Sequence, residues 1–149
     1  MNAATGINAY NSVSFESRVM GADPHKLISL LFDGALLAIS DAKNGILRKE
    51  IAAKGKSISK AISIIGEGLN ASLDKKVGGE LALNLSALYD YMVIRLVEAN
   101  LKNDIKILDE VAHLLSELKS AWDTIRPQVV GGQTQLSAPG NSPRTYASA

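Results

Sequence analysis

The chain contains no cysteine, which excludes disulfides, thiolate nucleophiles and the usual structural zinc sites. Only two histidines remain as nitrogen ligands, and we expect neither a metal site nor a cofactor. No sign of charge dominates, because 16 basic and 15 acidic residues leave a formal net charge of +1. A nearly neutral chain has no long-range field to attract nucleic acid or anionic lipid, so neither is an expected partner.

Long apolar runs are also missing. No segment approaches the roughly 18 consecutive apolar residues that a membrane span needs, and residues 1–6 do not resemble the start of a secretory signal. We therefore expect a soluble cytoplasmic protein that does not insert into a membrane.

Aromatic residues make up only 5% of the chain, with one Trp and two Phe, although 46% of the residues are hydrophobic. The apolar mass is therefore mostly Leu, Ile, Val and Ala, a composition that favours helices packed on helices. A length of 149 residues suits one domain with one core. The predicted fold class is all-α.

Capping residues and helix breakers divide the chain. Asp23 and Pro24 form a start signal for a helix over residues 24–49, and a second helical pattern covers 53–72. Gly78 and Gly79 stop any continuation, so a third helix is predicted over 80–100, beginning at Glu80.

The fourth predicted helix is capped by Asp104 and ends near residue 125, because Pro127 disfavours helical geometry at the residue before it. Short links between four helices predict an antiparallel four-helix bundle over residues 23–126. Residues 1–22 form a polar N-terminal arm that could act as a cap. Residues 127–149 are predicted to be a disordered tail, since they carry little apolar material.

The third helix has more apolar surface than one bundle face requires. Its predicted core face contains Leu81, Leu85, Leu88, Met92, Leu96 and Ala99, and a second stripe of Leu83, Ala87, Ile94 and Val97 lies opposite. The first helix repeats the excess. Its expected core stripe is Leu27, Leu31, Ala35, Ala38 and Ala42, flanked by Leu30, Leu36 and Leu37.

The other two helices carry weaker signals. A strip of small residues surrounds Ile64 in the second helix and indicates either a docking groove or tight internal packing; it contains Ser57, Ala61, Gly68 and Ala71. The fourth helix has a single apolar stripe and a polar opposite face that includes Glu110 and His113.

Large exposed apolar patches usually mark interaction sites, so the surplus predicts a surface that receives an amphipathic or extended partner segment. The predicted contact residues are Leu30, Leu36, Leu37, Ile64, Leu83, Ala87 and Ile94, with Tyr89 and Tyr91 lining a groove. The alternatives are that these residues belong to the core or to a homodimer seam, and that Tyr91 stacks on Arg95 one turn away.

Two patterns resemble enzyme sites but lack the required context. Glu110 and His113 have the Glu-x-x-His spacing of di-iron bundles, without the second copy and the further carboxylates that such sites need. Residues 66–71 mimic a dinucleotide fingerprint, but no strand precedes them. The chain is therefore not expected to be an enzyme.

Several runs together resemble the FliS-type flagellin export chaperones. They are Asp23-Pro24, Leu27 to Ala35, Lys60-Ala61-Ile62 through Leu69 and Leu73, Gly78-Gly79, Asn84-Leu85, Leu88 to Met92, Arg95-Leu96, Ala99-Asn100, Asn103-Asp104, Glu110, Leu114, Leu115, Leu118 and Trp122. In addition, Tyr10 matches a tyrosine typical of the family's N-terminal arm.

The resemblance implies a cytoplasmic chaperone that binds the C-terminal segment of flagellin and keeps it from polymerising early. It also implies transfer of flagellin to a membrane protein of the flagellar type III export gate, with Tyr10 anchoring an arm that covers part of the flagellin site. A weak homodimer is compatible with this function. The competing hypothesis is a homo-oligomeric adaptor or structural bundle that buries the extra stripes against its own copies.

Overall fold

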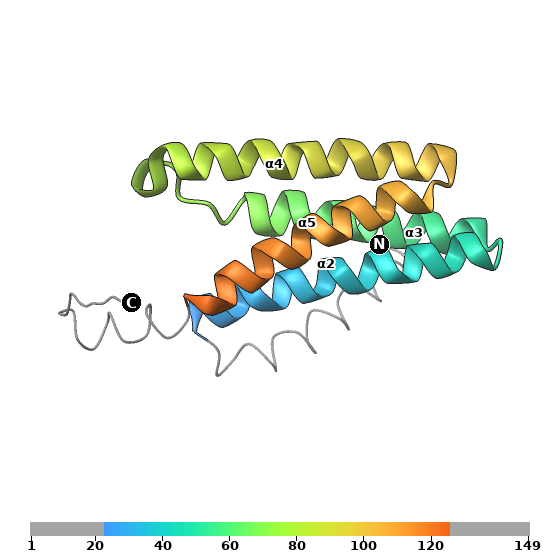
Figure 1. The fold of residues 1–149 in the computed structure, drawn as a ribbon, viewed down its shortest axis with the longest axis horizontal. Helices are drawn as coiled ribbons and strands as arrows, with labels where there is room; N and C mark the ends of the chain where they lie inside the picture. The colour runs from blue at the N-terminus through green and yellow to red at the C-terminus, as the bar shows by residue number, and fades with distance from the viewer. Residues whose placement is uncertain (1–22, 126–149) are drawn as a thin grey trace, which may run out of the picture.

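The computed structural model describes residues 23–125, in which four helices run alternately in opposite directions (Figure 1). This confirms the predicted all-α antiparallel bundle for that range, whereas the predicted arm and tail lie outside the described residues. The elements are α2 (Pro24–Leu47), α3 (Ile51–Ser63), its continuation as the π-helix η1 (Ile64–Asn70), α4 (Lys75–Lys102) and α5 (Ile105–Thr124).

The predicted caps start two of these helices. The Asp23 carboxylate accepts a hydrogen bond from the backbone N–H of Lys26 at 2.7 Å, with Pro24 in the first turn. Asp104 accepts from the N–H groups of Lys106 and Ile107 at 2.9 and 3.3 Å. Each carboxylate satisfies donors that the first turn of a helix leaves unpaired, which is why these boundaries follow from local sequence.

The second predicted helix is not uniform, because seven residues near its end, Ile64–Asn70, form η1. A Cβ added to Gly68 would lie 3.2 Å from the Leu31 side chain, and one added to Gly34 would lie 3.3 Å from Cδ1 of Ile64. The small residues therefore allow η1 and α2 to approach closely. Of the small residues predicted around Ile64, Gly68 and the buried Ala61 therefore serve internal packing, whereas Ala71 is exposed.

The helix after the double glycine begins earlier than predicted. Asp74 accepts hydrogen bonds from the N–H groups of Lys76 and Val77, so α4 starts with a turn at Lys75. The predicted break is nevertheless present, since Gly79 has φ 55° and ψ −130° and interrupts the helical geometry. This conformation strongly favours glycine, because a Cβ would clash with the backbone.

The core lies between all four helices. In α2 the predicted alanines Ala35, Ala38 and Ala42 are buried, together with Phe32 and Ile39, which the predicted stripe omitted. The prediction placed Leu27 and Leu31 in the core, but both are only half-buried. Because α2 packs on both α3 and α5, its buried face is rotated from the predicted stripe.

The end of α5 is fixed to the start of α2. The rings of His25 and Trp122 stack with centroids 4.5 Å apart. Trp122 Nε1 donates to the His25 carbonyl at 2.9 Å, and His25 Nε2 donates to the Trp122 carbonyl at 2.6 Å. Ser29 Oγ adds a 2.9 Å hydrogen bond to Asp123. This end of α5 is thereby committed to α2.

Because the end of α5 is fixed to α2, the prediction for Leu81 requires a correction. It was predicted on the core face of the third helix, but 67% of it is exposed. The last turns of α5 lie against α2 and not against the first turns of α4, so the start of α4 stands apart from them (Figure 1).

A buried lysine joins α3 to the end of α4. Lys54 is only 4% exposed, and its Nζ donates to the Asn100 carbonyl at 2.9 Å and to Asn103 Oδ1 at 2.7 Å. The carbonyls at a helix C-terminus carry partial negative charge, which the ammonium complements. Lys54 therefore caps α4 from a neighbouring helix.

Replacing Lys54 by methionine keeps the aliphatic stem but leaves the Asn100 and Asn103 acceptors without their buried donor. We expect Lys54→Met to lower the free energy of unfolding by about 1–3 kcal/mol, measured by urea denaturation. The matched control is Lys56→Met at an exposed position of the same helix, which should change the value by less than about 0.5 kcal/mol. Equal effects of the two substitutions would contradict the capping role.

Candidate functional site

An exposed row runs along α4 on the side opposite its buried residues. Its members follow one another in alternating steps of four and three residues, the spacing of a helix-to-helix seam. Three of its large side chains, Leu83, Ile94 and Leu101, are 56%, 65% and 79% exposed. We call this set the outer row, and it comprises Leu83, Ala87, Asp90, Ile94, Val97 and Leu101.

The outer row exists because α4 is apolar on two faces. Its inner face contributes buried residues such as Met92 and Leu96 to the core, against α3, η1 and α5. At about 100° per residue, the outer row points away from that face. All six members are exposed within the described structure, so most of an apolar seam faces solvent.

The outer row gathers three predicted contact residues, Leu83, Ala87 and Ile94, and Val97 from the same predicted stripe. Sequence reasoning missed Leu101, because the predicted helix ended at residue 100. It also missed Asp90, because a carboxylate interrupts an apolar stripe. The spacing could have revealed Asp90, because it lies three residues after Ala87 and four before Ile94, in step with the rest of the row.

Tyr89 requires a correction. It was predicted to line a partner groove, but it is 4% exposed and belongs to the core, where burial raises the pKa of its phenol to about 12. We therefore place Tyr89 in the core and not on the partner surface.

The predicted residues of α2 and η1 lie apart from the outer row. Leu37 is exposed, Leu30 is half-buried and Ile64 packs between η1 and α2. Leu36 packs against the core and borders an open hollow of about 440 Å³. The other lining residues of this hollow are all on α5: Ser116, Lys119, Ser120, Asp123 and Thr124. Tyr10 lies outside the described residues.

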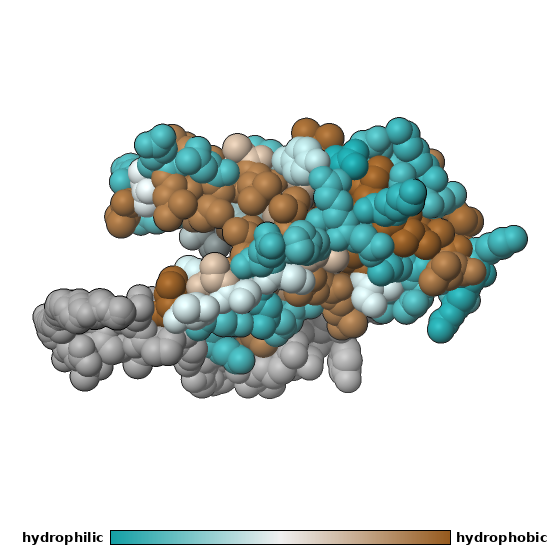
Figure 2. All heavy atoms as spheres, in the orientation of Figure 1, coloured by the Kyte–Doolittle hydropathy of each residue, from teal (hydrophilic) through white to brown (hydrophobic). Residues whose placement is uncertain are grey.

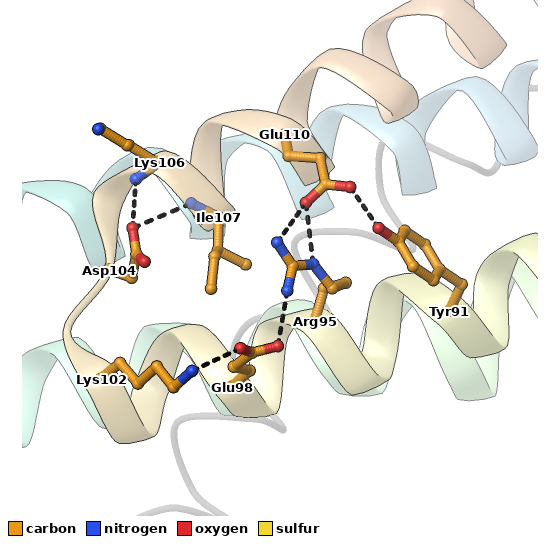
Figure 3. Close-up of polar contacts among 8 residues, drawn as sticks. All are labelled: Tyr91, Arg95, Glu98, Lys102, Asp104, Lys106, Ile107 and Glu110. Carbon is orange, nitrogen blue, oxygen red and sulfur yellow. Dashed lines mark hydrogen bonds and ion pairs between the residues drawn. The ribbon is translucent and has the colours of Figure 1, made fainter.

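A polar cluster ties the middle of α4 to α5 (Figure 3). Glu110 of α5 accepts hydrogen bonds from the Tyr91 hydroxyl and from Arg95 Nε, the latter at 2.9 Å. Arg95 also pairs with Glu98 at 2.6 Å, and Lys102 Nζ lies 2.8 Å from the same carboxylate. Tyr91 and Arg95 therefore meet on Glu110 and do not form the ring stack that was the alternative for Tyr91.

Glu110 was predicted to lie on a solvated face, and 35% of its side chain is exposed, but it also contacts α4, which the prediction did not include. The hydrogen bonds from Tyr91 and Arg95 hold the pKa of its carboxyl below the usual range. In return, the Glu110 carboxylate raises the pKa of the Tyr91 phenol. The Glu110 carboxylate therefore links α5 to α4 through an ion pair with Arg95 and a hydrogen bond from Tyr91.

Residues 23–125 give little support for a metal site or a membrane-spanning helix. That part of the chain has no group of three or more His, Asp or Glu residues arranged to hold a metal ion. His113 lies 3.1 Å from Glu117, while Glu110 is engaged with Arg95, so the two residues with di-iron spacing do not form a common site. None of the helices in this range combines the length and apolarity needed to cross a bilayer.

Comparison with known proteins relates these helices to flagellar export. A family model described as "Flagellar protein FliS" matches residues 6–129. The chain is 52% identical over 128 residues to the flagellar secretion chaperone FliS of Salmonella typhimurium, covering 86% of this chain and 95% of that protein.

Two further relatives carry similar names. The flagellar secretion chaperone FliSB of Pseudomonas aeruginosa is 50% identical over 125 residues, which cover 84% of this chain and 98% of the relative. The flagellar secretion chaperone FliS of Bacillus subtilis is 36% identical over 107 residues, or 72% and 78% of the two chains.

The Glu110 contacts predict a pH-dependent stability. Because folding lowers the pKa of this carboxyl, its contribution is fully present above the unfolded-state value of about 4.3 and is lost as the pH falls through the lower folded value. Glu110→Gln should therefore melt below the wild type at pH 7, and the gap should close on acidification below about pH 4.

Thermal melts across that range measure the gap. Glu67→Gln is the control, since Glu67 is exposed and forms no ion pair within the described residues. A gap between wild type and Glu110→Gln that stays constant with pH would show that the ionised carboxylate does not hold α5 to α4.

Proposed function

The chain belongs to the FliS family of flagellar secretion chaperones, and we propose that it binds the C-terminal segment of newly made flagellin in the cytoplasm. This family is one of export chaperones and not of enzymes. Binding would keep flagellin from polymerising early. The complex would then deliver flagellin to the membrane protein of the flagellar type III export gate.

The observation that carries this proposal is the outer row of α4. An unfolded segment that becomes helical on binding can bury its apolar side chains against Leu83, Ile94 and the other apolar members of the row. Ordering the segment costs conformational entropy, which keeps the affinity below what the buried area alone would give. A net charge of +1 agrees with recognition mainly by apolar contact.

The uncovered start of α4 gives the same proposal further support. In Figure 2 apolar residues cover much of its N-terminal half and border a hollow between this helix and the end formed by α2 and α5. Leu81 is exposed at this end although it shares a face with the half-buried Leu85 and Leu88. A long segment could therefore contact both sides of α4.

In this proposal flagellin is released when other contacts replace those with the chaperone. Nucleotide hydrolysis is not expected to drive release, because the sequence contains no nucleotide-binding motif in a suitable context. Two events would supply the replacement contacts. The export gate could compete for the bound segment, or residues 1–22 could return to the apolar surface with Tyr10 as an anchor.

Substitution of two exposed residues of the outer row tests the binding surface. Each of Leu83→Asp and Ile94→Asp should raise the dissociation constant for a flagellin C-terminal peptide by at least about tenfold, since each removes about 1.5–3 kcal/mol of apolar burial. The measurement is titration calorimetry, in which the wild type should also show a negative heat-capacity change.

The matched control is Leu47→Asp, at a similarly exposed leucine at the end of α2. It should bind like the wild type, and circular dichroism should show unchanged helix content in all variants. Unchanged affinity in both Leu83→Asp and Ile94→Asp would contradict the proposed surface. Wild-type sedimentation as an obligate oligomer would favour the homo-oligomeric adaptor instead.

Removal of residues 1–20 tests the competing arm. If these residues occupy part of the flagellin surface in the free chain, their loss should lower the dissociation constant several-fold, because the peptide no longer displaces them. Competition fluorescence polarisation with the same peptide measures the shift. A Tyr10→Ala chain should show part of it, and equal affinities for all three chains would remove the arm from the mechanism.

A further inference from the structure

We propose that Asp90 selects the register of the bound segment by pairing with a lysine or arginine placed within the apolar repeat of that segment. This inference rests on the proposed function, because it concerns the same outer row. It adds a chemical requirement that apolar burial does not contain, namely one cation at one position of the partner.

Asp90 is the one charged member of the outer row. It stands between Ala87 and Ile94, one step from each along the seam. A helix laid along the row would cover this position together with its neighbours, since seam residues of packed helices contact the partner directly. The carboxylate would then lose most of its water.

The carboxylate is oriented by a residue from another element. Asn70, the last residue of η1, donates from Nδ2 to Asp90 Oδ1 at 3.2 Å. The amide oxygen of Asn70 is buried and receives no hydrogen bond from the described residues. Turning the amide over would set that oxygen against the carboxylate, so the observed orientation of Asn70 holds the Asp90 carboxylate in its place within the row.

No cation neutralises Asp90 within residues 23–125, where the ion pairs involve other carboxylates. A neutral amide donor alone does not compensate a buried negative charge. A partner that brings an ammonium or guanidinium to this position does. Shifting the partner by one repeat would place an apolar side chain against Asp90, which is the basis of register selection by a single polar seam residue.

A second copy of this chain is a poorer occupant. Antiparallel pairing of two outer rows would bring both Asp90 carboxylates into the middle of the same apolar seam. Close to Asp90 neither the row nor its border supplies the matching cation, since the flanking residues Tyr91 and Val93 are uncharged and Lys102 lies further along α4, paired with Glu98. Like charges in such a seam oppose pairing.

Charge reversal in the full-length chain tests the proposal with a flagellin C-terminal peptide. Asp90→Lys should weaken binding at least tenfold and Asp90→Asn by a smaller factor. Replacing each lysine and arginine of the peptide by glutamate in turn should reveal one position that weakens binding to the wild type and restores binding to Asp90→Lys. The control Asp41→Lys makes the same charge change at an exposed site on α2 and should leave affinity unchanged.

The outcomes separate this inference from the proposed function. If Leu83→Asp and Ile94→Asp abolish binding while Asp90→Lys binds like the wild type, the outer row is supported as the binding surface and the role of Asp90 is overturned. Equal losses from Asp90→Lys and Asp41→Lys would show a general charge effect and overturn the inference. It is also overturned if no peptide position rescues Asp90→Lys, or if the wild type forms a stable dimer that Leu83→Asp dissociates.

Discussion

The bundle depends on how α5 divides its contacts between two neighbours. At its start Glu110 holds Arg95 and Tyr91 of α4, and at its end Trp122 is stacked and hydrogen-bonded to His25 of α2. A single straight helix cannot follow both neighbours along its whole length when it is fixed to one at each end. Because the ion pair of Asp109 with Lys43 also holds its start to α2, α5 follows α2 along its length and diverges from α4, so the first turns of α4 lose their cover (Figure 1).

The exposed helix is nevertheless well anchored. Its C-terminal end is capped by buried Lys54, its middle is tied to α5 through Glu110, and Asn70 of η1 contacts it at Asp90. These contacts come from three different elements. An apolar surface that is held in place before binding loses little entropy when a segment docks, so most of the ordering cost falls on the partner.

Local signals account for what the sequence could predict. Asp23 and Asp104 cap helices through neighbouring backbone N–H groups, and the double glycine marked the break in α4. The close approach of Gly68 in η1 to Leu31 joins residues that are distant in sequence, so local patterns did not predict it. The pairing of Glu110 with Arg95 depends on the rotation of α5 about its axis, and helical periodicity alone placed Glu110 in solvent. The apolar outer row was largely predictable, whereas the proposal that it binds flagellin comes only from the family resemblance.

A protein that carries an open apolar seam must avoid pairing with its own copies while it waits for a partner. Apolar contacts are not directional, so Leu83 and Ile94 alone cannot distinguish a partner helix from a second α4. A carboxylate within the seam makes that distinction, because it opposes a surface with the same charge and favours one with a cation. The cost is a weaker seam than an uninterrupted apolar row would give. In the role proposed for it, Asp90 would therefore exchange some affinity for selectivity.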